Sequence, residues 1–181
     1  MAGIFLWSTL ACVALFAFGQ ADAAALTGKV VGVSDGDTIT VFDANHQQLK
    51  IRLSGIDAPE KKQPFGQRSK QHLSDLVFSR EVDVIWHKHD RYRRIVGQVI
   101  VAHQPCLTAT CQKTTDAGLS QIDAGMAWWY RKYAHEQPTE KAAAYERAEA
   151  LSVTRSECQN SEVSSSQPSG HPCLSLLRKE L

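Results

Sequence analysis

The sequence predicts a single α+β domain, a five-stranded Greek-key β-barrel with about three helices. The chain has 181 residues, which is enough for one compact domain and too few for two well-developed ones. Short runs of β-branched residues lie within residues 27–53 and again within 82–101. A segment with helical periodicity separates these two groups, and further helical segments follow them.

The first group predicts three antiparallel strands in succession. Apolar, β-branched runs follow one another at residues 30–33, 38–42 and 49–53. Turn-forming residues separate the runs, beginning at Asp35 and at Asp43. Because Asp, Asn and Gly tolerate the backbone angles of tight turns, we expect hairpin connections here.

A helix and two more strands complete the predicted barrel. A helix is expected from about Pro64 to Val77, because apolar residues fall on one side at helical spacing. Strands at 82–86 and 95–101 flank a basic turn at 89–94. Three strands, a helix and two strands form the order of a Greek-key barrel of the oligonucleotide-binding type, the OB-fold.

Two further helices are expected after the barrel, at residues 118–124 and 139–152. Ala and Glu, which favour helix, dominate the second of them. We therefore predict that the folded domain spans residues 24–155. The Ser-rich segment 156–181 lacks an apolar period and is predicted to be a disordered tail.

Residues 1–23 are predicted to be a secretory signal peptide. The apolar run from Ile4 to Phe18 precedes Ala21-Asp22-Ala23, a small-x-small pattern typical of signal cleavage sites. An uncleaved anchor is the alternative, but the run is shorter than the roughly 20 residues that span a bilayer. We expect a secreted or periplasmic protein with no stable membrane association after cleavage.

The cysteines support the same destination. Cys106, Cys111, Cys158 and Cys173 remain after removal of the signal, an even number that suits a disulfide framework in an oxidising compartment. Three pairings are possible, and Cys106 with Cys111 is the preferred one. Zinc binding is the alternative, but neither pair has the two-residue spacing of a zinc knuckle.

Positive charge is clustered, although the formal net charge of the chain is only +1. Such clusters attract phosphate groups even when the total charge is small. The basic residues form two groups: Lys50, Arg52, Lys61, Lys62, Arg68 and Lys70, and then Arg91, Arg93 and Arg94.

The acids and arginines near these clusters suit phosphodiester hydrolysis. The reaction needs an activated water, neutralisation of charge on the phosphate and usually a hard cation. Carboxylates bind Ca²⁺ or Mg²⁺, guanidinium groups bind phosphate oxygens, and a further carboxylate can act as a base. The candidates are Asp35, Asp37 and Asp57 for the metal, Arg52 and Arg94 for the phosphate, and Glu60 for the base.

Three motifs in one order resemble the staphylococcal nuclease family. They are Asp35-Gly36-Asp37-Thr38, Arg52-Leu53-Ser54-Gly55-Ile56-Asp57-Ala58-Pro59-Glu60 and Asp90-Arg91-Tyr92-Arg93-Arg94. The likeness extends over roughly residues 28–150, and three motifs together are far more specific than any one alone. Arg93 departs from the family pattern, which commonly has Gly before the catalytic Arg.

The resemblance implies a calcium site and a phosphate clamp. Asp37 and Asp57 would bind Ca²⁺ through their carboxylates, and Ala58 through its backbone carbonyl. Arg52 would bridge the scissile phosphate near the metal. Arg94 would stabilise the transition state from the opposite side.

The resemblance also implies roles for three neighbouring residues. Glu60 would orient or deprotonate the attacking water. Asp90 and Tyr92 would lie on the substrate side of their turn, with Tyr92 near a terminal phosphate.

The implied protein is a monomeric, calcium-dependent endonuclease that hydrolyses phosphodiester bonds in DNA and RNA with little sequence specificity. The alternative is a non-catalytic OB-fold protein that only binds nucleic acid. Trp128, Trp129 and Tyr130 are expected to pack beneath the C-terminal helices, with stacking on bases as the alternative role.

Overall fold

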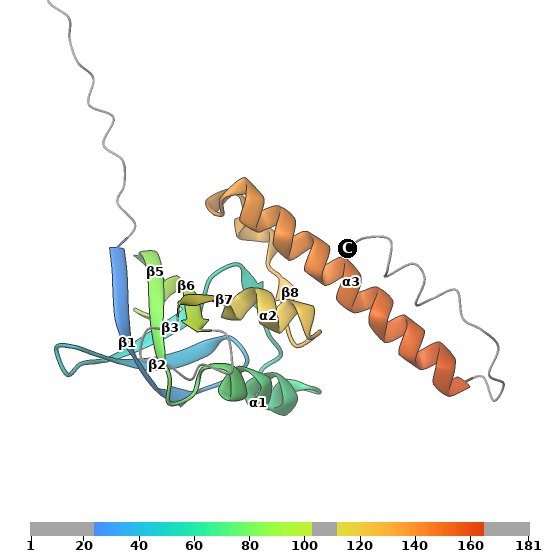
Figure 1. Ribbon diagram of the computed structural model, residues 1–181, viewed down its shortest axis with the longest axis horizontal. Helices are drawn as coiled ribbons and strands as arrows, with labels where there is room; N and C mark the ends of the chain where they lie inside the picture. The colour runs from blue at the N-terminus through green and yellow to red at the C-terminus, as the bar shows by residue number, and fades with distance from the viewer. Residues whose placement is uncertain (1–23, 103–111, 165–181) are drawn as a thin grey trace, which may run out of the picture.

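The computed structural model describes residues 24–102 and 112–164 (Figure 1). The predicted signal peptide, the Cys106–Cys111 pair and Cys173 lie outside the described residues. In the part of the chain that is described, no helix is long and apolar enough to cross a membrane.

Five strands form a closed barrel, as predicted. Their order around the barrel is β3-β2-β1-β5-β6, and a parallel pairing of β3 with β6 closes the ring. Neighbouring strands otherwise pair antiparallel. The strands are β1 (Ala24–Val33), β2 (Thr38–Asp43), β3 (Gln48–Leu53), β5 (Glu81–His89) and β6 (Ile95–Ala102).

Alternation of side chains along the strands builds the core. In β6 every second residue is buried, beginning with Ile95 and ending with Val101, which follows from the two-residue period of a strand. A register shift in β1 between Val30 and Gly32 bends this strand. Its first part therefore pairs with β5, and its second part pairs with β2.

Three α-helices lie alongside the barrel (Figure 1). The first connects β4 to β5, and the other two follow the barrel strands. They are α1 (Gly66–Val77), α2 (Ala117–Asp123) and α3 (Thr139–Ser164), with a 3₁₀ helix at Arg131–Glu136 before α3. The three predicted helices are confirmed.

The C-terminal helix is longer than predicted. We expected α3 to end near Ser152 and irregular chain from residue 156, but the helix continues to Ser164 and extends well beyond the barrel (Figure 1). Helix formation depends on backbone hydrogen bonds, and scattered Ser residues lower helix propensity only slightly. The lack of an apolar period in this segment therefore means that the segment has no apolar face to pack against the barrel. It does not mean that the segment cannot form a helix.

Three short strands were not predicted. They are β4 (Ile56–Asp57), β7 (Lys113–Asp116) and β8 (Trp128–Trp129). Strands of two to four residues are too short to show a periodic pattern. Pairing of β4 with β8 sets Asp57 opposite Trp128, so that segments about 70 residues apart in sequence meet beside the barrel.

The aromatic cluster divides between core and surface. Trp129 packs against the hydrophobic core, and its indole N–H donates to the side-chain oxygen of Gln137 at 2.9 Å. Trp128 is 56% exposed, so the expectation of core packing is wrong for this residue. The β4–β8 pairing explains the difference, because successive side chains of a strand point to opposite faces.

A buried hydrogen-bond network attaches α3 to the rest of the domain. The hydroxyl of Tyr145 in α3 donates to Asp116 Oδ2 at 2.9 Å, and Gln98 of β6 donates to the same atom at 2.8 Å. The other Asp116 oxygen caps the N-terminus of α2. Burial lowers the pKa of Lys141, which lies 3.7 Å from Asp116, although the negative charge of Asp116 opposes this shift. This network orients the two C-terminal helices against the barrel.

Candidate functional site

The candidate site begins at the aspartate loop, defined here as residues 35–37, which connects β1 to β2. Asp35 Oδ1 accepts a hydrogen bond from the backbone N–H of Asp37 at 3.1 Å. Asp37 stands directly before β2 and is only 4% exposed. Its Oδ1 accepts a hydrogen bond from the hydroxyl of Thr38 at 2.8 Å. The loop therefore holds one carboxylate at the edge of the barrel in a fixed orientation.

Arg52 connects the two predicted metal-binding acids. This residue lies in β3, directly opposite Thr38 of β2. Its Nη1 forms an ion pair with Asp37 Oδ2, and its Nη2 donates to Asp57 Oδ1 at 2.9 Å. The backbone N–H of Ala58 also points to Asp37 Oδ2, at 3.4 Å. The structure thus brings the acids, Arg52 and the Ala58 backbone together.

Electrostatics make Asp37 an unusual carboxylate. Burial raises the pKa of Asp37, the positive charge of Arg52 opposes this shift, and the nearby charge of Asp35 adds to it. Burial alone would lower the pKa of Arg52, but the charges and hydrogen bonds of its two acids raise it. A single guanidinium therefore does not fully offset the burial of Asp37, and additional positive charge at this point would be favourable.

Residues of α1 and α2 fix the aspartate loop through a hydrogen bond and close contacts. Gln121 in α2 is fully buried, and its Nε2 donates to the Gly36 carbonyl at 2.6 Å and to the Ser69 carbonyl at 3.1 Å. Its Oε1 contacts the Nδ1 atom of His72 in α1. A Cβ atom at Gly36 would overlap Ser69 Oγ, so the loop and α1 are in close contact. We did not predict this role for Gln121, because one polar residue within a helix carries no local signal.

Arg94 stands directly before β6, at the end of the basic turn. Its Nε forms an ion pair with Asp90 Oδ2 at 2.7 Å, and its Nη1 donates to Thr38 Oγ1 at 3.2 Å. Because Thr38 also donates to Asp37, one hydroxyl connects Arg94 to the aspartate loop. Tyr92 is exposed, and its ring centre lies 5.5 Å from the Arg94 Cζ atom.

Asp90 organises this turn. Its Oδ1 accepts hydrogen bonds from the backbone N–H groups of Tyr92 and Arg94, at 2.8 and 2.9 Å. Partial burial opposes ionisation, but these hydrogen bonds and the charge of Arg94 lower the pKa of Asp90. Asp90 therefore remains ionised and orients the Arg94 side chain.

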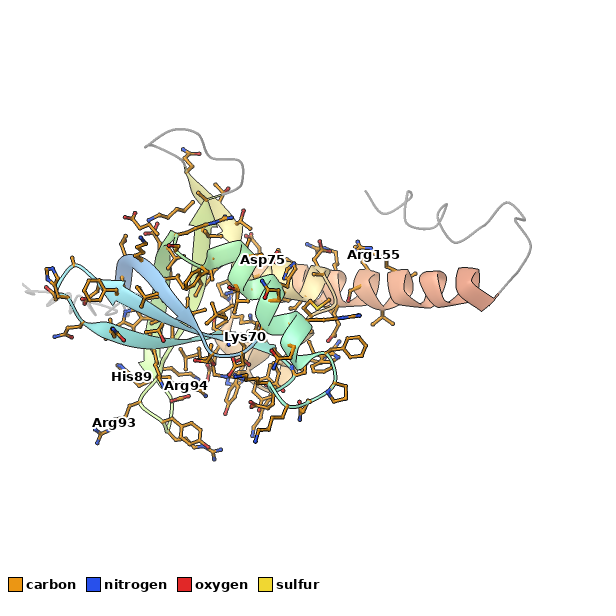
Figure 2. All side chains as sticks on the ribbon, turned by 90° about the horizontal axis from the view of Figure 1, so that it is seen from below. Lys70, Asp75, His89, Arg93, Arg94 and Arg155 are labelled. Atoms are coloured by element: carbon orange, nitrogen blue, oxygen red, sulfur yellow. The ribbon has the colours of Figure 1, made fainter. Side chains whose placement is uncertain are left out.

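Arg93 has a left-handed backbone, with φ of 61°. Glycine adopts this conformation easily, whereas a residue with a Cβ atom does so at an energetic cost. Arg93 thus occupies a backbone conformation that favours the Gly common at this position in the family. Figure 2 shows the Arg93 side chain pointing away from the barrel, while Arg94 lies close to it.

Glu60 lies on the exposed loop between β4 and α1, three residues after Asp57. Its backbone N–H donates to the Gln63 side chain at 2.8 Å, and its carbonyl accepts from the Gln63 N–H at 2.8 Å. The loop is therefore closed on itself, and the Glu60 side chain is accessible to solvent. This position is open to water.

The site residues fit a hard divalent cation, with an open rather than a closed site. Among the described residues, no three His, Cys, Asp or Glu side chains gather around one point. The carboxylates of Asp37 and Asp57 are the available donors, and both supply oxygen. The structure places the backbone N–H of Ala58 beside Asp37, and the predicted role of the Ala58 carbonyl stays a prediction. Ca²⁺ and Mg²⁺ prefer oxygen ligands and complete their coordination with water or substrate phosphate. Burial raises the pKa of Asp37 despite the charge of Arg52, so a further positive charge beside this carboxylate would favour its ionised form.

Comparison with known proteins identifies the family. A sequence profile described as Staphylococcal nuclease homologue matches residues 50–155, which is more than half of the chain. This chain belongs to the staphylococcal nuclease family. The matched segment contains Arg52, Asp57, Glu60, Asp90 and Arg94, whereas the aspartate loop precedes it.

Several curated proteins are similar to this chain. An uncharacterized endonuclease from Haemophilus influenzae is 40% identical over 110 residues, covering 61% of this chain and 56% of that protein. A micrococcal nuclease from Shigella flexneri is 43% identical over 106 residues, covering 59% of each chain. Protein ParB from Escherichia coli is 42% identical over 108 residues, covering 60% of this chain and 59% of that protein. The match therefore spans less than two thirds of each of these relatives.

Proposed function

We propose that this protein is a calcium-dependent endonuclease that hydrolyses phosphodiester bonds in DNA and RNA with little sequence specificity. The observation that carries the proposal is the convergence of Asp37, Asp57 and Arg52 at one edge of the barrel, with Arg94 connected through Thr38. Two relatives with nuclease or endonuclease in their names agree with it. The chemistry of this residue set agrees as well, because it combines anionic oxygens for a cation with two guanidinium groups for a phosphate.

Each residue has a distinct task in the proposed reaction. Asp37, Asp57 and the Ala58 carbonyl would hold Ca²⁺, which supplies Lewis-acid stabilisation of the phosphate charge. Arg52 and Arg94 donate hydrogen bonds to non-bridging phosphate oxygens, where negative charge increases in the transition state. Both guanidinium groups are already oriented by ion pairs with acids, which reduces the reorganisation needed on substrate binding.

Glu60 is the proposed general base. Its exposed carboxylate accepts a proton from the attacking water as the water oxygen bonds to phosphorus. The bond to the 5′-oxygen breaks, and this oxygen leaves with the bond electrons. No base-reading element takes part in these contacts, and phosphate contacts carry little sequence information. Low sequence specificity follows.

Export and a monomeric state belong to the same proposal. The apolar segment and small-x-small pattern of residues 1–23 support a secreted or periplasmic enzyme that leaves the membrane after cleavage. A non-specific nuclease outside the cytoplasm would also be separated from the chromosome of its own cell.

The decisive experiment is a parallel digestion of single-stranded DNA, plasmid DNA and RNA in Ca²⁺, in Mg²⁺ and in a calcium chelator. We expect cleavage of all three substrates in Ca²⁺ and loss of cleavage in the chelator. Cleavage that continues in the chelator would contradict the metal role. Binding of nucleic acid without any cleavage would instead support the alternative, a non-catalytic OB-fold protein.

Arg94 and Arg93 provide a matched pair within one turn. Arg94→Ala should slow cleavage on the order of 10²-fold or more, as loss of a transition-state donor does. Arg93→Gly removes the same charge from the neighbouring position, whose side chain points away from the barrel, and should keep the parent rate within a few fold (Figure 2). Equal rates for the two variants, measured in single-turnover assays, would exclude the assigned role of Arg94.

A further inference from the structure

An exposed aromatic side chain lies directly after the loop that carries Glu60. Phe65 is 64% exposed, which is high for phenylalanine. It also has a positive φ of 63°, a conformation that aromatic residues rarely adopt. Backbone outliers of this kind cluster at binding sites, where the surrounding structure maintains them. The exposed ring is therefore a candidate for ligand binding.

The backbone around Phe65 is constrained, and its neighbour Gly66 lies against the backbone of Glu60. The N–H of Gly66 donates to the Gln63 carbonyl at 3.1 Å, and the Phe65 carbonyl accepts from the Ser69 N–H at 2.9 Å. A Cβ atom at Gly66 would overlap the Glu60 carbonyl oxygen, so the chain passes directly over Glu60. The ring of Phe65 is thus presented from a constrained loop beside the proposed general base.

The surroundings of the ring suit an anionic, aromatic ligand. The Arg68 Cζ atom lies 5.6 Å from the centre of the Phe65 ring. Both residues line a shallow depression of about 320 Å³ together with Gln63 and Gln67. Residues 60–68 contain three basic side chains and one acidic side chain. A flat apolar face next to positive charge is the arrangement that single-stranded nucleic acids recognise on their binding proteins.

We propose that Phe65 and Arg68 form a stacking site for a nucleobase of a single-stranded substrate, outside the phosphate clamp of Arg52 and Arg94. The base stacks on the Phe65 ring, and Arg68 pairs with a neighbouring phosphate. This site rests on the proposed nuclease function and adds a requirement for substrate length. Every base has an aromatic face, so the site increases affinity without selecting a sequence.

Phe78 is a matched control for Phe65. It is 51% exposed and lies directly after the C-terminus of the same helix, α1. The two residues flank the 12 residues of α1, so their backbone positions are about 20 Å apart along the helix axis. Removal of Phe78 therefore deletes a comparable exposed ring at the end of α1 remote from Glu60.

The experiment compares a short with a long substrate. The short substrate is a nitrophenyl ester of thymidine 5′-phosphate, which has one base, and the long one is a single-stranded thymidine 12-mer. Phe65→Ala should raise the KM for the 12-mer by about 5- to 150-fold, the range expected for loss of one stacked base, and should leave kinetics with the ester unchanged. Phe65→Trp should keep the low KM for the 12-mer, and Phe78→Ala should leave the kinetics with both substrates unchanged.

Two results would overturn the stacking site. If Phe65→Ala impairs both substrates equally, the residue acts through the Glu60 loop. If Phe65→Ala leaves the KM for the 12-mer unchanged, as Phe78→Ala should, the Phe65 ring binds no base. Phe65→Leu retains apolar bulk without an aromatic face, and it should behave like Phe65→Ala even if the alanine variant folds poorly.

A binding measurement separates this inference from the proposed function. Fluorescence anisotropy of a labelled 12-mer in the presence of chelator reports affinity without cleavage. A parent protein that binds the 12-mer but cleaves neither substrate would refute the nuclease function, while weaker binding by Phe65→Ala would still support the stacking site. Equal anisotropy titrations for the parent protein, Phe65→Ala and Phe78→Ala would refute the stacking site alone.

Discussion

Replacement of Arg52 by methionine tests the electrostatic core of the site. The substitution keeps an unbranched apolar stem but removes the charge that pairs with Asp37 and Asp57. Asp37 would then be a buried carboxylate without an adjacent cation. Breaking a buried ion pair from one side typically destabilises a protein by about 3–5 kcal/mol.

Protonation of Asp37 sets an upper limit on this loss. The ordinary pKa of the Asp37 carboxyl is 3.8. Each pH unit above that value adds about 1.36 kcal/mol to the free energy of protonation, which amounts to about 4.4 kcal/mol at pH 7 and about 1.6 kcal/mol at pH 5. The unpaired charge cannot destabilise the protein by more than this, since the carboxyl can take up a proton instead. We expect a loss of about 2–4 kcal/mol at pH 7 and less than about 2 kcal/mol at pH 5.

The direction of the pH effect follows from linkage. Burial raises the pKa of Asp37 in the folded protein, so ionisation of this group destabilises the fold above that pKa. Removal of Arg52 raises the pKa further. As the pH falls through the raised value, the folded state takes up a proton and regains stability.

The assay is urea unfolding followed by tryptophan fluorescence, with chelator present at both pH values. Arg80→Met is the control, because Arg80 donates from the surface to the Asp75 carbonyl at 3.2 Å. It should lose no more than about 1 kcal/mol, equally at both pH values. An equal loss at pH 5 and pH 7 for Arg52→Met would refute the view that Arg52 balances the charge of Asp37.

Three further predictions concern the support of the site. Gln121→Met should lower stability by about 2–4 kcal/mol and weaken Ca²⁺ binding measured by calorimetry, because it removes the buried donor to the aspartate loop. Tyr145→Phe is the control, since it loses a hydrogen bond to Asp116 and should lower stability without changing the Ca²⁺ affinity. Arg93→Gly should raise the free energy of unfolding by about 1 kcal/mol, because φ is positive there; a lower urea midpoint would exclude strain at this position. In chelator at pH 7 Asp37→Asn should be more stable than the parent protein, whereas Ca²⁺ at a hundredfold excess over its Kd should stabilise only the parent, by about 2.7 kcal/mol.

The elements with a strong local period were predictable. The five barrel strands and α1 follow from β-branched runs, turn residues and helical spacing, which depend on neighbours in the chain. The roles of Asp37, Arg52, Asp57, Glu60 and Arg94 were predicted because their motifs stand in one order, and these roles stay predictions. The structure shows that Arg52 contacts both Asp37 and Asp57. Short elements such as β4 and β8 escaped prediction, since two residues cannot display a period.

What the sequence determined by itself was therefore the set of elements and the chemical groups available, because backbone propensity and side-chain chemistry are local properties. Only the tertiary structure decided which groups meet. The parallel pairing of β3 with β6 closes the barrel, and α2 sets Gln121 beneath Gly36, 85 residues earlier in the chain. It also decided that Arg52 joins two acids and that Phe65 remains exposed. Contacts between such distant residues arise from packing of the whole barrel, and no local pattern encodes them.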